Sequence, residues 1–424
     1  MKLFVEASPK IPLVSIVVAF QSGSSHDPVG KEGLTRATAR MLRRGCEGLT
    51  ADAIEEAVDG LGGEFGCDAA PTSITVHAEV IRRNLDPFVE LVGKVLGAPT
   101  FEPEECARLL RETEAEIVES RDNDRVLASR AFRRALFADH PYARRVSGTL
   151  DTLASLRPED LRAQYERHFC RENALVAISG DVTESTAREI SERLLSRLPA
   201  GARVVDSVPE PSPPPGRTLV LVDKAERTQT QMALGWLGTH PRDPDHFAWI
   251  VGNTTFGGTF TSRLMQEIRA KRGWSYGVSS RVGFDRHRDA FVVWSAPSAK
   301  DAPACLELEI ELLEALRAKG LTSEELAFTK NYLARSYAFE IDTARKRVHQ
   351  RLEEALYDLP EGYHARYLER LGQLSLDEVN SALKQRTPVE DLIVAVVATD
   401  ADTGALLEKA AGGRPRQVVA YDCE

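Results

Sequence analysis

The sequence is poor in the features that mark secreted and membrane proteins. Its six cysteines are scattered without a C-x-x-C pair, so a disulfide framework is not expected. No apolar run approaches the roughly 18 residues of a membrane span, and the segment MKLFVEASPK lacks the apolar core of a signal peptide. We therefore expect no membrane span and a cytoplasmic protein, or a periplasmic one if a leader has been removed.

Positive charge is also in short supply. The chain has 54 Lys and Arg residues against 64 Asp and Glu, a formal net charge of −10, and no long block of basic residues reverses this locally. Such a balance disfavours a phosphate backbone or an anionic membrane surface as the partner. We expect no nucleic acid, and a peptide or protein is the more natural ligand.

Common catalytic motifs are missing as well. The nine histidines include no pair four residues apart, and His26, His140 and His287 are expected to be loop or core residues. There is no G-x-S-x-G elbow, and Gly30-Lys31 does not complete a phosphate-binding loop. The sequence predicts no metal site in this chain.

The chain is long enough for two domains, and its two halves resemble each other. At 424 residues it exceeds the size of one hydrophobic core. The predicted strand 232–237 matches 15–20 at an offset of 217, and the helix–strand unit 374–397 matches 156–178 at an offset of 218. A nearly constant offset indicates duplication. The proline-rich stretch 199–217 is predicted to link an N-terminal domain, 1–198, to a C-terminal domain, 218–424.

Hydrophobic periodicity predicts mixed helices and strands in each half. Strands are expected at 14–20, 74–80 and 174–179, where β-branched or alternating apolar residues occur. Helices are expected at 34–43, 84–96 and 102–119. The sequence thus predicts an α+β fold with sheets layered by helices, in two homologous domains.

The stretch 257–280, GGTFTSRLMQEIRAKRGWSYGVSS, combines a glycine turn, a helix and a strand. Gly257 and Gly258 allow backbone conformations closed to other residues, the helix is expected to run to about residue 271, and a strand is expected over 275–282. Arg269 and Tyr276 are seven residues apart, so a turn can direct both side chains to one point. Taken singly, such residues are more often a solvated helix-end cation and a half-buried strand aromatic.

This stretch resembles the second-domain signature of the pitrilysin/insulysin clan of zinc peptidases, the inverzincins, which include the mitochondrial processing peptidase and bacterial heterodimeric peptidases. In that family a matching Arg and Tyr hold the substrate peptide, the role implied here for Arg269 and Tyr276, with Gly257 and Gly258 letting the backbone pass close to the peptide. The resemblance covers nearly the whole chain. It implies two domains, each with a mixed, mainly antiparallel sheet, that form a half-clamshell.

The metal motif of that family is lost. An active subunit carries H-x-x-E-H on its first helix, but Arg36 and Arg40 stand where the histidines would be and Ala39 where the general base would be. A guanidinium offers no lone pair to zinc, and alanine cannot accept a proton. Glu116 matches the family's third ligand. It is either one acid on a solvated helix or the partner of Arg36 or Arg40 in a charge-assisted bridge.

The resemblance therefore implies a non-catalytic subunit of a heterodimeric zinc metalloendopeptidase. The chain itself is expected to hold no cofactor and to be inactive alone, while a homologous subunit with H-x-x-E-H supplies zinc and the general base. Arg269 and Tyr276 would serve substrate binding and oxyanion stabilisation on a peptide or unfolded protein. The alternatives are a purely structural core-type subunit and a homodimeric, non-catalytic peptide-binding chamber.

Overall fold

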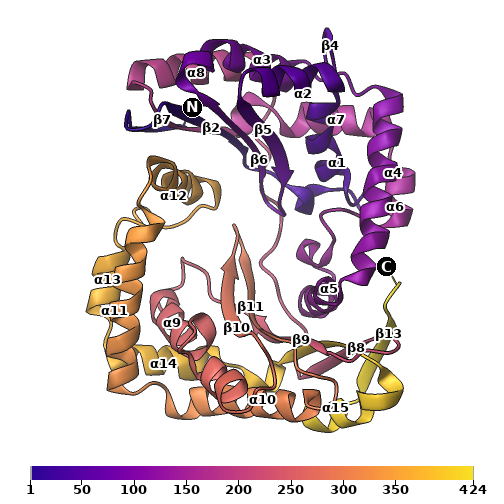
Figure 1. Ribbon diagram of the computed structural model, residues 1–424, viewed down its shortest axis with the longest axis vertical. Coiled ribbons are helices and arrows are strands. Elements are labelled where there is room, and N and C mark those ends of the chain that lie inside the picture. The colour runs from indigo at the N-terminus through magenta and orange to yellow at the C-terminus, as the bar shows by residue number, and fades with distance from the viewer. Residues whose placement is uncertain (1, 424) are drawn as a thin grey trace. The chain divides into compact units, whose positions relative to one another are not determined.

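The computed structural model describes residues 2–423, which form two compact units (Figure 1). The first unit holds the chain up to Ile117 together with Arg144–Val208 and Ala338–His364. The second holds Val118–Ala143, Pro209–Tyr337 and the chain from Ala365 onward. Each half of the sequence thus contributes one segment to the unit built mainly from the other half. The predicted domains 1–198 and 218–424 are continuous stretches of sequence, so they do not include these exchanged segments.

The first unit is built on a five-stranded sheet in the order β1-β7-β2-β6-β5. β1 runs parallel to β7, and the other neighbours are antiparallel. The expected strands at 14–20, 74–80 and 174–179 are β2, β6 and β7, within about one residue at each end. The strands of this sheet are β1 (Lys2–Ala7), β7 (Ala174–Gly180), β2 (Leu13–Phe20), β6 (Ile74–Ile81) and β5 (Gly63–Ala69).

Both faces of this sheet carry apolar side chains. Along β2, Val14, Ile16 and Val18 point into the main core, which helices such as α3 and α8 cover. The alternate residues Val17 and Ala19 face the other way and pack with Leu175 and Ala177 of β7 and with three residues of α12 (Val348, Leu352, Leu356). A helix from the second half of the sequence is therefore needed to cover the second face (Figure 1).

The helices of the first unit follow the expected apolar spacing. The predicted helices 34–43, 84–96 and 102–119 are α1, α3 and α4, with α1 ending in a short 3-10 turn over Leu42–Arg44. A two-stranded ribbon, β3 (Gly45–Cys46) and β4 (Leu49–Thr50), follows that turn. The helices are α1 (Leu34–Met41), α2 (Ala51–Gly60), α3 (Leu85–Gly97), α4 (Pro103–Glu119), α6 (Leu150–Ser155), α7 (Pro158–His168), α8 (Glu184–Arg197) and α12 (Ala344–Leu356).

The second unit repeats this sheet with one more strand. Its order is β10-β11-β9-β12-β8-β13, and β8 runs parallel to β12, which is antiparallel to β9, as β1, β7 and β2 do in the first unit. The common order supports the internal repeat read from the sequence. The strands are β8 (Thr218–Asp223), β9 (Gln231–Leu237), β10 (Val278–Phe284), β11 (Arg288–Ser295), β12 (Ile393–Ala398) and β13 (Arg416–Ala420).

Helices cover both faces of the second sheet as well. Every residue of β12 is buried, and α5 (Asp124–Phe137), from the first half of the sequence, packs across β12, β9 and β8 (Figure 1). The remaining helices are α9 (His246–Asn253), α10 (Ala302–Lys319), α11 (Ser323–Glu340), α13 (Tyr367–Gln373), α14 (Leu376–Arg386) and α15 (Ala405–Ala410). The α+β architecture expected from the sequence is confirmed.

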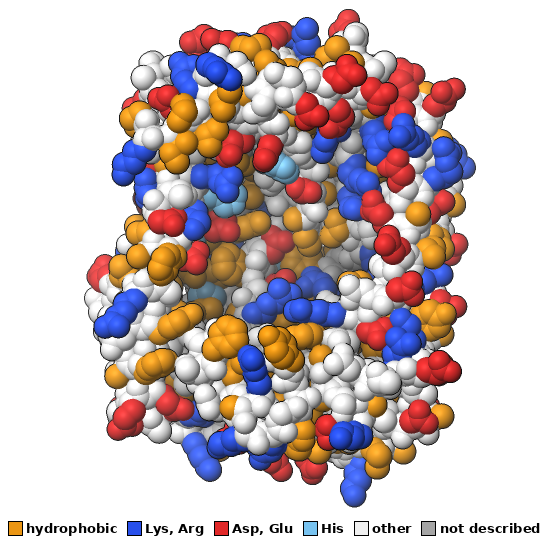
Figure 2. Space-filling view, viewed as in Figure 1, with side chains coloured by type: hydrophobic (Ala, Val, Ile, Leu, Met, Phe, Trp, Pro, Cys, Tyr) orange, Lys and Arg blue, Asp and Glu red, His pale blue; other side chains and the backbone are white. Residues whose placement is uncertain are grey.

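The connecting segment and the surface agree with the composition. Residues 199–214 are neither helical nor extended in a sheet, and the chain passes from the first unit to the second between Val208 and Pro209. All six cysteines are free thiols, and no helix within residues 2–423 is both long and apolar enough to cross a membrane. On the face shown in Figure 2, basic side chains are interspersed with acidic ones and do not form one broad basic patch.

Candidate functional site

The segment that contains Arg269 begins and ends in π-helical geometry. Thr254–Gly258 and Met265–Ala270 are π-helices, and the Lys271 N–H donates to the Gln266 carbonyl, five residues back, at 3.0 Å. The helix predicted up to about residue 271 is therefore present but wider than an α-helix. Such π-helical turns are rare and frequently found at functional sites, since the extra residue per turn redirects side chains.

Gly257 is required by close packing and not by its backbone angles. A Cβ at residue 257 would lie 2.3 Å from Ser280 Oγ and 2.6 Å from the Ser280 backbone nitrogen. Ser280 is itself held by a 2.7 Å hydrogen bond from its hydroxyl to the Asn253 side chain. A Cβ at Gly258 would have no neighbour closer than 3.5 Å, and neither glycine has a positive φ. The expectation of special backbone conformations was wrong: only Gly257 is constrained, and by its contact with β10.

Arg269 and Tyr276 come together in the second unit, in a stack with a third residue. The Arg269 guanidinium carbon lies 4.7 Å from the centroid of the Tyr276 ring and 5.8 Å from that of Phe260. Tyr276 precedes β10, which begins at Val278 and not at residue 275 as predicted. The turn is pinned by Ser275, whose hydroxyl donates to the Gly277 carbonyl at 2.6 Å and accepts from the Ala296 N–H at 3.0 Å.

The polar ends of this stack are not used inside the molecule. Arg269 forms no ion pair, and the Tyr276 hydroxyl no hydrogen bond, with any residue that the structure describes. Tyr276 is 87% exposed and Phe260 is 80% exposed, the two highest values among the described aromatic side chains. A cation held between two exposed rings keeps its N–H donors available to a ligand. The sequence reasoning missed Phe260, whose one signal was an aromatic among small residues in GGTFTS.

Four other predicted residues, Arg36, Ala39, Arg40 and Glu116, lie together in the first unit. Arg36 and Arg40 are one turn apart on α1 and both face Glu116 on α4. Arg36 Nη2 lies 3.0 Å from Glu116 Oε2, and Arg40 bonds both carboxylate oxygens, at 2.8 and 3.1 Å. Arg40 also donates to the Thr113 hydroxyl at 3.0 Å. Of the alternatives left open, the bridge is present and uses both arginines, while Ala39 is fully buried.

The electrostatics of this cluster follow from two cations sharing one acid. Partial burial alone would raise the pKa of Glu116, but hydrogen bonds and charge from Arg36 and Arg40 lower it below its ordinary value. The carboxylate therefore stays ionised and the cluster keeps a net positive charge. Two guanidinium groups and one occupied carboxylate do not fit a zinc ion, and residues 2–423 contain no group of three or more His, Cys, Asp or Glu placed to hold a metal.

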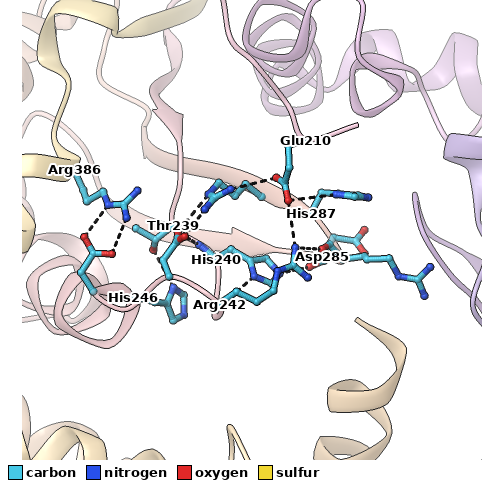
Figure 3. Close-up of polar contacts among 12 residues, drawn as sticks. Glu210, Thr239, His240, Arg242, His246, Asp285, His287 and Arg386 are labelled. Carbon is cyan, nitrogen blue, oxygen red and sulfur yellow. Dashed lines mark hydrogen bonds and ion pairs between the residues drawn. The ribbon is translucent and has the colours of Figure 1, made fainter. Parts of the chain in front are cut away.

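A second polar cluster, in the second unit, has a structural role. Glu210 forms ion pairs with Arg242, Arg288 and His287, at 3.3, 3.3 and 3.6 Å. Figure 3 labels Glu210, Arg242 and His287 of this cluster. These contacts attach the part of the connecting segment that contains Glu210 to the β10–β11 hairpin. His287, a loop residue as expected from the sequence, takes part in this anchor.

Two buried histidines in the same cluster are accounted for by hydrogen bonds. His240 contacts the Asp285 carbonyl at 3.0 Å, and His246 contacts the Thr239 hydroxyl at 2.9 Å (Figure 3). Burial lowers the pKa of each imidazole to about 4, so both are neutral at physiological pH. These histidines support the fold and are not placed as ligands.

Comparison with known proteins points to one family along most of the chain. Residues 2–150 match the family described as Insulinase (Peptidase family M16), and residues 155–333 match the Peptidase M16 inactive domain. The chain is 22% identical over 396 residues to the non-peptidase homolog YmxG of Helicobacter pylori, covering 92% of this chain and 90% of that protein. It is 21% identical over 396 residues to the uncharacterized zinc protease YmxG of Bacillus subtilis, covering 93% and 95%.

A solved structure agrees with this result. The peptidase M16 inactive domain from Pseudomonas fluorescens superposes with a TM-score of 0.86 at 26% identity, over 93% of this chain and 95% of that one.

Proposed function

This chain belongs to the M16 (insulinase) peptidase family, and from that premise we propose that it is the non-catalytic subunit of a heterodimeric zinc peptidase. Its partner is a homologous chain that carries H-x-x-E-H and so supplies the metal and the general base. This chain supplies Arg269 and Tyr276. The observation that carries the proposal is the contrast between its two sites: the metal position is filled by an ion bridge, whereas the Arg269–Tyr276 stack has free donors.

The chemistry assigned to the pair follows from its donors. Tyr276 carries one hydroxyl on a rigid ring, suited to donate to the carbonyl oxygen of the scissile peptide as negative charge develops there. Arg269 carries several N–H donors in one plane, and the rings of Tyr276 and Phe260 restrict how that plane can turn. We assign Arg269 to a neighbouring carbonyl of the substrate, a contact made already in the ground state.

The zinc of the partner would polarise the same scissile carbonyl and activate water for attack. At the position of the family's metal site, this chain has no residue that replaces these functions, since Ala39 has no proton acceptor and Arg36 and Arg40 are engaged by Glu116. It is therefore expected to cleave nothing alone. Purified chain analysed for zinc and assayed for peptidase activity tests this part of the proposal. A molar equivalent of chelator-sensitive zinc with activity in the isolated chain would refute it.

The role of the pair is tested in the assembled complex. The chain is co-expressed with an H-x-x-E-H homologue from the same genome, and complexes shown intact by gel filtration are compared by steady-state kinetics. Tyr276→Phe should lower turnover by about two to three orders of magnitude with little change in substrate binding, the effect of losing one oxyanion donor. Arg269→Ala should weaken binding as well as turnover. Tyr332→Phe, which removes a hydroxyl from another exposed tyrosine of the second unit, is the matched control.

The same experiment separates this proposal from a purely structural role. If Tyr276→Phe and Arg269→Ala complexes turn over substrate like the wild type, the pair contributes neither to substrate binding nor to catalysis, and the chain has a purely structural role. A scaffold would have no use for two exposed aromatics around an unpaired arginine.

A further inference from the structure

Helix α11 lies at one edge of the second unit, beside α13, and is only lightly packed (Figure 1). Of its 18 residues only Leu326 and Thr329 are buried, whereas α10, of the same length, has seven buried residues. Two large apolar side chains of α11 face solvent, since Phe328 is 55% exposed and Tyr332 is 42% exposed. Neighbouring exposed aromatic side chains on one helix are typical of a surface that another protein covers.

The part of α11 that belongs to the second unit has four charged side chains, and two of them are engaged within the unit. Glu325 pairs with Arg263 at 2.6 Å, and Lys330 donates to two backbone carbonyls around the end of α13, at 2.7 and 3.0 Å. Glu324 and Arg335 are exposed, and neither forms an ion pair with any residue that the structure describes. One acid and one base of α11 therefore keep their charges available.

These two charges lie on the same side of α11 as the two rings. Glu324 and Arg335 are eleven residues apart, which is three helical turns, so their side chains point in nearly the same direction about 16 Å apart along the axis. Phe328 is four residues after Glu324, and Tyr332 is three residues before Arg335, so both rings lie between the charges on that side. We call this face the α11 stripe (Glu324, Phe328, Tyr332, Arg335).

The charge order of the α11 stripe is complementary to itself. If two copies of the helix pair antiparallel about a two-fold axis midway between Glu324 and Arg335, the acid of each copy lies opposite the base of the other. Parallel pairing would place acid against acid and base against base, an arrangement of like charges that is unfavourable. The stripe therefore fits a second copy of itself in the antiparallel orientation only.

The same axis brings large side chains opposite small or short ones. Tyr332 faces Ala327 of the second copy and Phe328 faces Asn331, and all four of these residues are exposed in the single chain. A ring opposite a short side chain lets two helices approach to the usual distance of about 8–10 Å between their axes. The rings would thereby leave water at the centre of the contact, with the ion pairs at its ends.

We propose that the α11 stripe docks a second copy of this chain, paired antiparallel along α11. The inference goes beyond the proposed function, since it adds a contact that the H-x-x-E-H subunit does not use. Two heterodimers would be joined through their α11 helices into a tetramer. One helix from each copy makes a small interface, so the association is expected to be weak and concentration-dependent, with a dissociation constant roughly in the micromolar range.

The test measures self-association of the full chain by sedimentation equilibrium across the micromolar range. Arg335→Glu places a glutamate opposite Glu324 at both ends of the dimer, and Glu324→Arg places an arginine opposite Arg335. Each variant alone should associate at least about tenfold more weakly than the wild type, because two ion pairs become two like-charge pairs.

The decisive sample is an equimolar mixture of the two variants. One chain then has acids at positions 324 and 335 and the other has bases at both, so a mixed dimer re-forms both ion pairs. The mixture should associate about as tightly as the wild type, although neither variant does so alone. Arg414→Glu makes the same charge change at another exposed arginine of the second unit and should leave association unchanged. Circular dichroism of each variant checks that the fold is retained.

Three results would overturn the inference. The first is a wild-type chain that stays monomeric throughout, and the second is a mixture that associates no better than its two components. The third is a pair of variants that self-associate like the wild type but no longer assemble with the H-x-x-E-H subunit, because the stripe would then be the surface for that subunit. A chain that self-associates as expected but forms no active complex with an H-x-x-E-H homologue would refute the proposed function and leave this inference intact.

Discussion

Glu309 gives the sharpest quantitative prediction, because it is a carboxyl group with no access to water. It lies on α10 in the core of the second unit, is fully buried, and has the Cys305 sulfur 3.9 Å from its Oε1. Burial raises its pKa to about 8, and the nearby Ser295 hydroxyl and Cys305 thiol lower it only in part. In the unfolded chain the ordinary value of 4.5 applies. The folded state therefore holds a proton that the unfolded state releases at neutral pH.

The sign and size of the effect follow by linkage. Stability is unaffected by Glu309 below pH of about 4.5, falls as pH rises toward about 8, and is constant above that value. Each pH unit in this window costs about 1.4 kcal/mol, so between about pH 5 and pH 7.5 the wild type should lose about 3 kcal/mol through this residue. Glu309→Gln keeps the shape and cannot ionise. It should not show this loss.

The assay is urea unfolding at both pH values. All four tryptophans (Trp236, Trp249, Trp274, Trp294) lie in the second unit, so intrinsic fluorescence reports the unit that contains Glu309. Glu311→Gln, an exposed position on the same helix, is the control and should follow the wild type. If Glu309→Gln and wild type lose the same free energy of unfolding between the two pH values, the carboxyl group is not held neutral and the reasoning is refuted.

Two further predictions concern the other sites. Glu116→Gln should lower the free energy of unfolding by only about 1 kcal/mol, since the bridge to Arg36 and Arg40 is partly solvated. Because the pKa of Glu116 is lowered in the folded state, this stabilisation is present above about pH 4.5 and is lost as the pH falls through the folded pKa. Unfolding followed by circular dichroism at neutral and at acidic pH measures the difference. Gly257→Ala should cost about 1–3 kcal/mol through its clash with the Ser280 backbone. Gly258→Ala should be close to neutral, and equal effects of the two substitutions in thermal unfolding would contradict the packing argument.

The structure clarifies why parts of the site could be predicted from sequence. The spacing of Arg36 and Arg40 places them one turn apart on a helix whatever the rest of the fold does, because helical periodicity is a local property. The predicted proximity of Arg269 and Tyr276, seven residues apart, is likewise correct although the helix type and the start of the strand were predicted wrongly. In both cases the two residues are close in sequence and separated by one turn, so modest errors in element boundaries leave their relative placement unchanged.

Other features depend on contacts between distant segments. The reason for Gly257 is the approach of Ser280 on a neighbouring strand, which no pattern around residue 257 reveals. Phe260 is marked as a site residue only by its exposure and by its position against Arg269. Burial of Glu309 is equally invisible, since the helix that carries it also carries exposed glutamates at other positions.

The sequence by itself determined the most strongly patterned strands and helices, the repetition of the two halves and the loss of the metal motif. These follow from periodicity and residue chemistry, which act over a few neighbours along the chain. Only the tertiary structure decided that α5 and α12 are exchanged between the units and that one face of α11 stays exposed. The physical reason is that each sheet has two apolar faces. Which helix covers the second face depends on the apolar surface area buried between segments hundreds of residues apart, and this area cannot be read from local sequence patterns.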